Sequence, residues 1–526
     1  MISQFSHLPN IYIHISFSSI CQINQKVRFC LFLHQEMEME TLVPKQKCET
    51  KSVFRRWGAF GKEMNRVNSI ALPMIVVTVS QYLMRASPMF MFGHLNELSL
   101  SSASIATSIC NVTGYSVVFG MASALETLCG QAYGAGHYKR LGTFSYGAIL
   151  SISIVCLPLS LVFICTEKLL LWTGQDPLIS AEAGKFAVQL IPTLFPYAIL
   201  QCLVRYLQSQ SLILPMVWSS LASLCFQIPL CWAFIFKLNL GNAGAALSIG
   251  ISYWFNVVLL VLYVKYSPAC SRTRPPFSKD VLITVREFFR LAIPSAAMVC
   301  LEWWSFELIL LLSGVLPNPQ LETSVLSICF TISYLHYHIP YSFGAAASTL
   351  ISNELGAGKP EAARVTLYAV LILSITEFLL ASIAILICGP ILGYAFSEEK
   401  EVVDYVKEMA PFLGLSIIMD SLQAVLSGVA RGSGWQRIGA YVNLGAYYLV
   451  CNPVALVVVF VLHLKGKGLW SALLMGATVQ CVALSIVTGL TNWEKQAKEA
   501  RQRIFSGDFS AQNESVCNHE KLVETC

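Results

Sequence analysis

The sequence predicts an all-α polytopic membrane protein with two similar lobes of six transmembrane helices each. Composition is the first reason. Hydrophobic residues make up 55% of the chain and charged residues only 12%, whereas soluble domains carry about 25% charged residues. The second reason is that apolar windows long enough to cross about 30 Å of hydrocarbon recur along the chain. The third is an internal repeat.

The repeat is clearest in two short stretches. TLCGQAYGAG at 127–136 aligns with TLISNELGAG at 349–358, so that the paired residue numbers differ by 222 (349 − 127). A similar difference of 224 (453 − 229) relates Pro229 to Pro453. A long repeat in so hydrophobic a chain is typical of transporters built from two halves.

We predict twelve spans, six in each half. Their ranges are 67–93, 101–124, 142–166, 183–207, 213–236, 243–264, 288–315, 323–350, 362–388, 406–430, 438–463 and 468–490. Because each half has an even number of spans, both halves have the same orientation and are related by an axis along the membrane normal.

These spans divide the chain into five segments. They are an N-terminal cytoplasmic segment at 1–55, an N-lobe at 56–264, a basic cytoplasmic linker at 265–287, a C-lobe at 288–490 and a cytoplasmic tail at 491–526. Residues 1–40 lack the basic start, apolar core and cleavage site of a signal peptide. An extension from an upstream start and a genuine cytoplasmic tail both stay open. We expect the polar tail after Trp493 to be flexible.

Basic residues predict the orientation. Lysine and arginine concentrate in the linker 265–287, in the loops after the second, eighth and tenth spans, and in the C-terminal tail. The opposite loops are mixed or acidic, although Lys185, Lys465 and Lys467 weaken the contrast. Positively charged loops remain on the cytoplasmic side, so we expect both termini to be cytoplasmic.

The repeated motifs resemble the signature of the multidrug and toxic compound extrusion (MATE) transporters. Further stretches resemble the plant detoxification branch: CLEWWSFE at 300–307, LPNP at 316–319 and GVARGSGWQ at 428–436. The resemblance covers about residues 55–495. It implies twelve helices in two lobes, a V-shaped cavity, and export of organic compounds in exchange for protons.

Two acids within the spans are candidate proton-coupling residues, Glu302 and Asp420. An ionisable group at a helix centre costs about 2.5–3.5 kcal/mol on insertion scales and is therefore a functional candidate. Their repeat-related positions, Ser80 or Gln81 and about Tyr197, are not acidic, so the acids lie in the second half only. The resemblance supports both residues as proton sites. The alternative is a structural carboxyl satisfied by a neighbouring hydroxyl.

Aromatic and amide side chains predict a substrate cavity, because aromatic faces attract planar or cationic organic molecules. The candidates are Gln81, Tyr334, Tyr337, Tyr341, Asn443 and Tyr447. Packing or lipid-facing roles are the alternative for each of them. For Glu307 and Glu377 we favour roles outside proton coupling, and for Glu377 an interhelical hydrogen bond. His336 and His338 point to different helix faces and are weaker candidates for carrying protons.

The Gly-Ala-Gly turns are predicted to be structural, since glycine ends helices without steric cost. We expect Gln131 and Asn353 to bond the carbonyl groups freed there. We expect the neighbouring acids to pair with nearby basic residues: Glu126 and Glu354 with Lys139, Arg140 or Arg364.

Arg85, in the first span, departs from the resembled family, which usually has an uncharged residue there. A guanidinium in a membrane stays charged, so it needs a carboxylate or water. Pairing with a cavity acid would make Arg85 a modifier of coupling, whereas snorkelling outward would not. Leu350 and Cys451-Asn452 are further departures.

Together these features predict a secondary transporter that exports organic solutes or xenobiotics such as alkaloids, flavonoids and cationic drugs in exchange for protons. A proton-independent uniporter or channel is the nearest alternative, and a membrane-embedded enzyme a more distant one. The sequence has no GxxxxGK[ST] motif for ATP. We expect no cofactor, no metal and no nucleic-acid partner, and a monomer in the lipid bilayer of the vacuole or the plasma membrane.

Overall fold

The computed structural model describes residues 46–92, 97–314 and 316–505. Residues 1–45 of the predicted N-terminal segment 1–55 and the end of the tail, 506–526, lie outside the described residues. Two compact units divide the chain, residues 1–59 and 60–526. The architecture below is that of the second unit.

The described residues are helical almost throughout. The elements are α2 (Gln46–Phe92), α3 (Glu97–Cys110), η1 (Asn111–Tyr115), α4 (Ser116–Gly134), α5 (Tyr138–Ile164), α6 (Thr166–Trp172), α7 (Pro177–Ser209), α8 (Leu214–Trp232), η2 (Ala233–Lys237), α9 (Gly241–Tyr266), η3 (Pro268–Cys270), α10 (Asp280–Ser313), α11 (Pro319–Gly356), α12 (Pro360–Leu392), η4 (Gly393–Ala395), α13 (Lys400–Ser433), α14 (Gln436–Asn443), η5 (Leu444–Cys451), α15 (Asn452–Phe460) and α16 (Lys465–Leu490).

These elements confirm the predicted fold class. Eleven helical segments in the described part of the chain are long and apolar enough to cross a membrane. The remaining long helix, α11, is the eighth predicted span. The helices extend a few residues beyond most predicted limits. In particular, α10 begins at Asp280, inside the segment expected to be linker.

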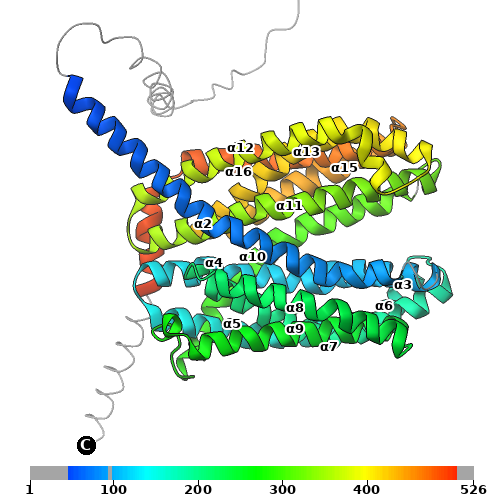
Figure 1. The fold of residues 1–526 in the computed structure, drawn as a ribbon, viewed down its shortest axis with the longest axis horizontal. Helices are drawn as coiled ribbons and strands as arrows, with labels where there is room; N and C mark the ends of the chain where they lie inside the picture. The colour runs from blue at the N-terminus through cyan, green and yellow to red at the C-terminus, as the bar shows by residue number, and fades with distance from the viewer. Residues whose placement is uncertain (1–45, 93–96, 315, 506–526) are drawn as a thin grey trace, which may run out of the picture. The chain divides into compact units, whose positions relative to one another are not determined.

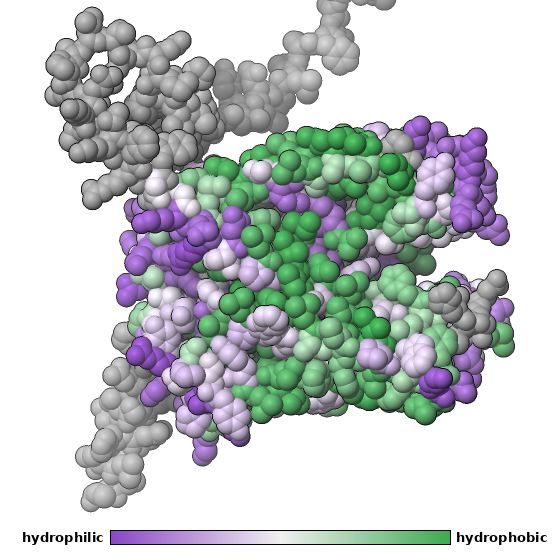
Figure 2. Space-filling view, viewed as in Figure 1, coloured by the Kyte–Doolittle hydropathy of each residue, from purple (hydrophilic) through white to green (hydrophobic). Residues whose placement is uncertain are grey.

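The helices form two lobes, which Figure 1 shows as two layers. Helices α2 to α9 belong to the N-lobe and α10 to α16 to the C-lobe, and the first part of α10 also packs against α4 and α5. The two lobes meet mainly where α4 packs against α10 and α11. Figure 2 shows a broad apolar band between two polar ends, as expected for a membrane-spanning bundle.

One end of the molecule joins the lobes, and we call it the basic end. It contains the turns at 135–137 and 357–359 and a terminal helix at 493–505. Toward the opposite end the lobes separate, and Figure 2 shows a notch opening between them.

The two repeated motifs face each other across the basic end. Gly134 lies against the backbone of Asn353, and Gly356 lies against the backbone of Gln131, with no room for a Cβ at either glycine. The repeat that aligns 127–136 with 349–358 also aligns Gln131 with Asn353 and Gly134 with Gly356. The interface is therefore two-fold symmetric, and glycine is required because the backbones approach so closely.

Hydrogen bonds repeat the same symmetry. Gln131 donates from Nε2 to the carbonyl of Gly432 at 3.3 Å, and Asn353 donates from Nδ2 to the carbonyl of Ser209 at 3.1 Å. Both amides therefore bond carbonyl groups at the ends of α13 and α7 in the opposite lobe. The prediction that they bond the carbonyl groups freed at the Gly-Ala-Gly turns is wrong for these donors, because the close approach of the lobes brings other helix ends within reach.

The helix at 493–505 corrects the expectation of a flexible tail after Trp493. Four side chains of this helix are buried, and their helical spacing places them on one face: Trp493, Ala497, Ala500 and Ile504. This helix contacts both lobes, because Arg503 donates to Gln131 Oε1 at 2.6 Å and Trp435 donates to Gln496 Oε1 at 3.0 Å. The apolar stripe outweighs the polar composition of the segment.

Candidate substrate and proton-coupling site

Glu302 lies on α10 inside the C-lobe and is only 8% exposed. Its Oε2 atom accepts hydrogen bonds from three amide groups: Gln423 at 2.9 Å, Asn443 at 3.3 Å and Gln480 at 3.3 Å. Burial disfavours a charged carboxylate, whereas hydrogen bonds from N–H donors favour it. The surroundings of Glu302 therefore balance its charged and protonated forms against each other.

Asn443 and Tyr447 fix this network from η5 and its flanks. Tyr447 donates from its hydroxyl to Gln480 Oε1 at 2.7 Å. Gln480 in turn donates to Asn443 Oδ1 at 2.8 Å, and Asn443 also donates to the Met298 carbonyl at 2.7 Å. The chain of bonds holds the amides in one orientation, so that their N–H groups point at Glu302. Of the predicted cavity residues, Asn443 and Tyr447 are thus brought directly to the acid.

Asp420 lies on α13 beside a small pocket of about 30 Å³, whose lining includes Phe306, Phe330, Ser333, Ser416 and Trp470. Asp420 is partly buried and close enough to Glu302 for the two carboxyl groups to interact electrostatically. Two neighbouring carboxylates repel each other when both are charged. The charge of each carboxyl group therefore affects the protonation of the other.

The three predicted tyrosines of α11 have different surroundings. Tyr337 lies near Glu302 and Asp420. Tyr334 is 47% exposed and lies within electrostatic range of both acids. Tyr341 is buried and accepts a hydrogen bond from Arg205 Nη2 at 3.0 Å. Tyr341 therefore belongs to the contact between the lobes.

Gln81, the predicted cavity residue on α2, is partly buried, and its Nε2 atom has no hydrogen-bond partner among the described residues. The structure does not bring Gln81 into the network around Glu302.

A second buried charge cluster joins the lobes at the basic end. Glu126 of α4 is 2% exposed and forms ion pairs with Arg205 of α7 at 3.2 Å and with Arg431 of α13 at 2.9 Å. The prediction that Glu126 pairs with Lys139, Arg140 or Arg364 is wrong. Two arginines inside helices supply the countercharge instead, because a buried carboxylate needs partners at its own depth.

The other predicted ion pairs of the basic end also differ. Glu354 pairs with Arg66 of α2 at 2.8 Å, whereas Arg140 pairs with Glu287 at 2.9 Å. Arg364 pairs with Glu361 in its own helix at 3.2 Å. Sequence proximity suggested partners within each lobe, but Arg66 and Glu354 come from opposite lobes.

The remaining membrane acids lie away from Glu302. Glu307 accepts a hydrogen bond from Ser108 at 2.6 Å. Glu377 and His336 form an interhelical contact of 2.7 Å, which confirms the hydrogen bond expected for Glu377. His338 instead packs against the ring of Tyr82, with centroids 5.1 Å apart.

Arg85 forms no ion pair with Glu302, Asp420 or another carboxylate of the described residues. Its guanidinium lies over the ring of Tyr197, 6.0 Å from the centroid. The side chain is partly exposed. Of the two possibilities left open by the sequence, direct pairing with a cavity acid is therefore wrong.

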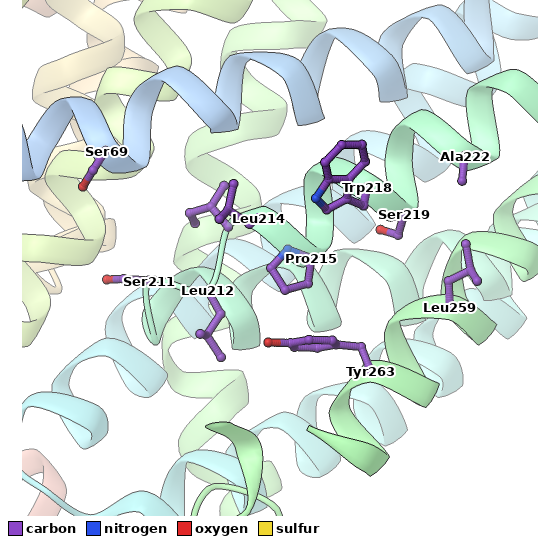
Figure 3. Close-up of a pocket in the computed structure, with 11 residues that line it drawn as sticks. Ser69, Ser211, Leu212, Leu214, Pro215, Trp218, Ser219, Ala222, Leu259 and Tyr263 are labelled. Carbon is purple, nitrogen blue, oxygen red and sulfur yellow. The ribbon is translucent and has the colours of Figure 1, made fainter. Parts of the chain in front are cut away.

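A larger pocket of about 790 Å³ lies elsewhere in the N-lobe. In Figure 3 the side chains of Leu212, Pro215 and Tyr263 converge on it, with Trp218 of α8 beside them and Ser69 of α2 at its margin. None of the predicted site residues lines this pocket. Its mainly apolar walls distinguish it from the polar network around Glu302.

The sequence model of the MatE family matches residues 73–233 and 294–457, and the starting positions of the two segments differ by 221 (294 − 73). The chain belongs to the MatE family. The two matches therefore reproduce the internal repeat, one in each lobe.

Relatives of this MATE protein indicate its branch. Protein DETOXIFICATION 14 of Arabidopsis thaliana is 52% identical over 463 residues, which cover 88% of this chain and 95% of the relative. DETOXIFICATION 12 of the same plant is 51% identical over 449 residues, covering 85% of this chain and 93% of the relative. This chain is accordingly a MATE transporter of the DETOXIFICATION type.

Solved structures agree with this assignment. The crystal structure of the eukaryotic MATE transporter AtDTX14 matches with a TM-score of 0.82 and 52% identity, covering 85% of this chain and 99% of that one. The bent form of the Vibrio cholerae MATE transporter VcmN matches with a TM-score of 0.72 at 15% identity, covering 85% of this chain and 99% of that one. At that identity the likeness concerns the fold alone.

Two of the three amides around Glu302 in this MATE transporter, Gln423 and Gln480, were not predicted from the sequence. Gln423 and Gln480 lie on α13 and α16, and nothing in their spacing relates them to an acid on α10. Polar amides in apolar helices are a usable signal, since each must find a partner in the bundle. Arg205 and Arg431 could have been recognised in the same way.

Proposed function

We propose that this MATE transporter exports organic solutes in exchange for protons, and that Glu302 and Asp420 carry the protons. The observation that supports this proposal is the arrangement around Glu302, a buried carboxyl group that accepts hydrogen bonds from three amide groups. Such a group can change its protonation when water or substrate reaches it, because burial disfavours the charged form while the amide donors favour it. Asp420, its neighbour, adds a second charge that is coupled to the first.

We further propose that transport proceeds by alternating access. The basic end is closed and a notch is open at the opposite end. This arrangement supports the proposal, because a transporter that works by alternating access is closed on one side of the membrane and open on the other in each conformer. The basic loops make the joined end cytoplasmic, so the described conformer faces away from the cytoplasm. Both termini would then be cytoplasmic, in a vacuolar or plasma membrane.

The test is transport into proteoliposomes by Glu302→Gln. Glutamine keeps the shape and the acceptor oxygen for the three amides but cannot release a proton. We expect uptake of a fluorescent organic cation such as ethidium, driven by a pH gradient, to fall at least about 10-fold. Binding of the same compound without a gradient should change little, because the network stays intact.

Glu307→Gln is the matched control, five residues further along the same helix. Glu307 bonds Ser108 rather than the amide network, so its variant should keep gradient-driven uptake. Full gradient-driven transport by Glu302→Gln would refute the assignment. Wild-type transport that follows only the solute gradient would favour the alternative, a uniporter or channel.

A further inference from the structure

The N-lobe contains a positive charge that has no carboxylate partner among the described residues, that of Arg85. Its guanidinium lies near four tyrosines, Tyr82, Tyr115, Tyr197 and Tyr253. No carboxylate of the described residues pairs with it. An arginine inside a membrane is costly without a partner, and such residues mark binding sites or ion pathways.

Three of the tyrosines form a rigid base for Arg85. Tyr197 meets Tyr115 edge to face at 5.0 Å and lies 5.7 Å from Tyr253. All three rings are buried, and the Tyr115 hydroxyl is hydrogen-bonded to Thr193. The guanidinium rests over the Tyr197 ring. A cation–π contact stabilises the charge but leaves the N–H donors in the guanidinium plane available.

The contacts of α2 with α11 give the position of Arg85 along α2. From the basic end inward, they are Arg66 with Glu354 at 2.8 Å, Thr78 with Ser342 at 3.5 Å and the rings of Tyr82 and His338 at 5.1 Å. Arg85 lies one turn beyond Tyr82. The three other tyrosines near its guanidinium belong to η1, α7 and α9 of the N-lobe. Arg85 therefore lies in the N-lobe, next to the contact of α2 with α11.

We propose that Arg85 is the anion-binding group of a substrate subsite, and that this subsite selects aromatic carboxylates among the organic solutes. The inference rests on the proposed export function. The planar fork of a guanidinium matches a carboxylate with two parallel hydrogen bonds. Tyr82 and His338, packed together beside it, offer ring surfaces to the aromatic part of the solute.

The charges of the two lobes give this subsite a direction. Arg85 lies in the N-lobe, whereas Glu302 and Asp420 lie in the C-lobe. A carboxylate is attracted by Arg85 and repelled by the two acids. An organic cation is repelled by Arg85 and attracted by the two acids. The subsite thus separates solutes by charge as well as by shape.

The experiment measures binding of radiolabelled cinnamate and of cinnamamide, its neutral amide, to the detergent-purified full chain without a pH gradient. We expect wild type to bind cinnamate about 10-fold more tightly than cinnamamide, as a charge-assisted hydrogen bond allows. Arg85→Gln should abolish the preference. Arg85→Lys should retain part of it, because lysine keeps the charge but not the fork.

Arg286→Gln serves as the control, since Arg286 is exposed near the start of α10 and should leave the preference unchanged. Equal binding of both compounds by wild type, or a preference that survives in Arg85→Gln, would overturn the proposal. If Arg85→Gln does not fold, the wild-type ratio and Arg85→Lys still decide. Failure of proton coupling would appear in the transport assay and leave the binding preference untouched.

Discussion

Gly134→Ala should shift the transporter away from the conformer described here. Gly134 packs on the backbone of Asn353, and Gly356 makes the symmetric contact with Gln131. A methyl group at residue 134 must push the lobes apart, because its neighbour is backbone and cannot rotate away. Gly356→Ala should have the same effect, since the two-fold symmetry makes the contacts equivalent.

The structure gives the size of the effect. The added Cβ would lie 2.7 Å from the carbonyl carbon of Asn353 and 2.8 Å from its Cα, whereas carbon atoms pack at about 3.5–4.0 Å. The lobes must therefore separate by about 1 Å. That movement weakens the bonds from Gln131 to Gly432 and from Asn353 to Ser209. Each bond contributes about 1 kcal/mol. Loss of both would therefore raise the ratio of open to closed basic ends by about 30-fold.

Distances between spin labels at Lys139 and Lys359 would measure this shift, since both residues are exposed on opposite lobes at the basic end. The labelled protein needs two sets of cysteines replaced. The first set comprises the exposed cysteines of the described residues, Cys165, Cys225 and Cys388. The second comprises Cys21, Cys30, Cys48, Cys517 and Cys526. Gly134→Ala should populate longer distances. Gly445→Ala is the matched control, because a Cβ there meets nothing within 4 Å. An unchanged distance distribution in Gly134→Ala would refute the reasoning.

Three further outcomes are expected. Tags at Thr273 and near Glu399 should lie on opposite sides of the membrane, the first cytoplasmic; finding both on one side would contradict the helix count. Deleting 493–505 should lengthen the same spin-label distances, because this helix bonds both lobes; unchanged distances would exclude that role. Glu377→Gln should keep gradient-driven uptake, because Glu377 contacts His336 away from Glu302; loss of uptake would add Glu377 to the pathway.

The sequence predicted the helices better than the polar contacts, for a physical reason. Hydropathy and the repeat depend on local composition, so the spans and the position of Glu302 followed directly. Its amide partner Gln480 is 178 residues away, and no local pattern records such a contact. Glu126 was assigned basic partners close in sequence, but the bundle supplies Arg205 and Arg431 from α7 and α13.

The two partners of Glu126 should have different roles, because only one of them belongs to the other lobe. Arg431 belongs to the C-lobe and pairs with Glu126 of the N-lobe, so opening the basic end separates the two. Arg205 belongs to the same lobe as Glu126 and remains beside it as a countercharge. Breaking a buried pair costs about 3–5 kcal/mol when one charge is left alone. The retained Arg205 reduces that cost and makes opening feasible. Arg431→Gln should therefore lengthen the Lys139–Lys359 distances more than Arg205→Gln does, although both should lower Tm. Equal lengthening by the two variants would mean that the lobe of origin does not matter, and that Glu126 acts only as a structural anchor.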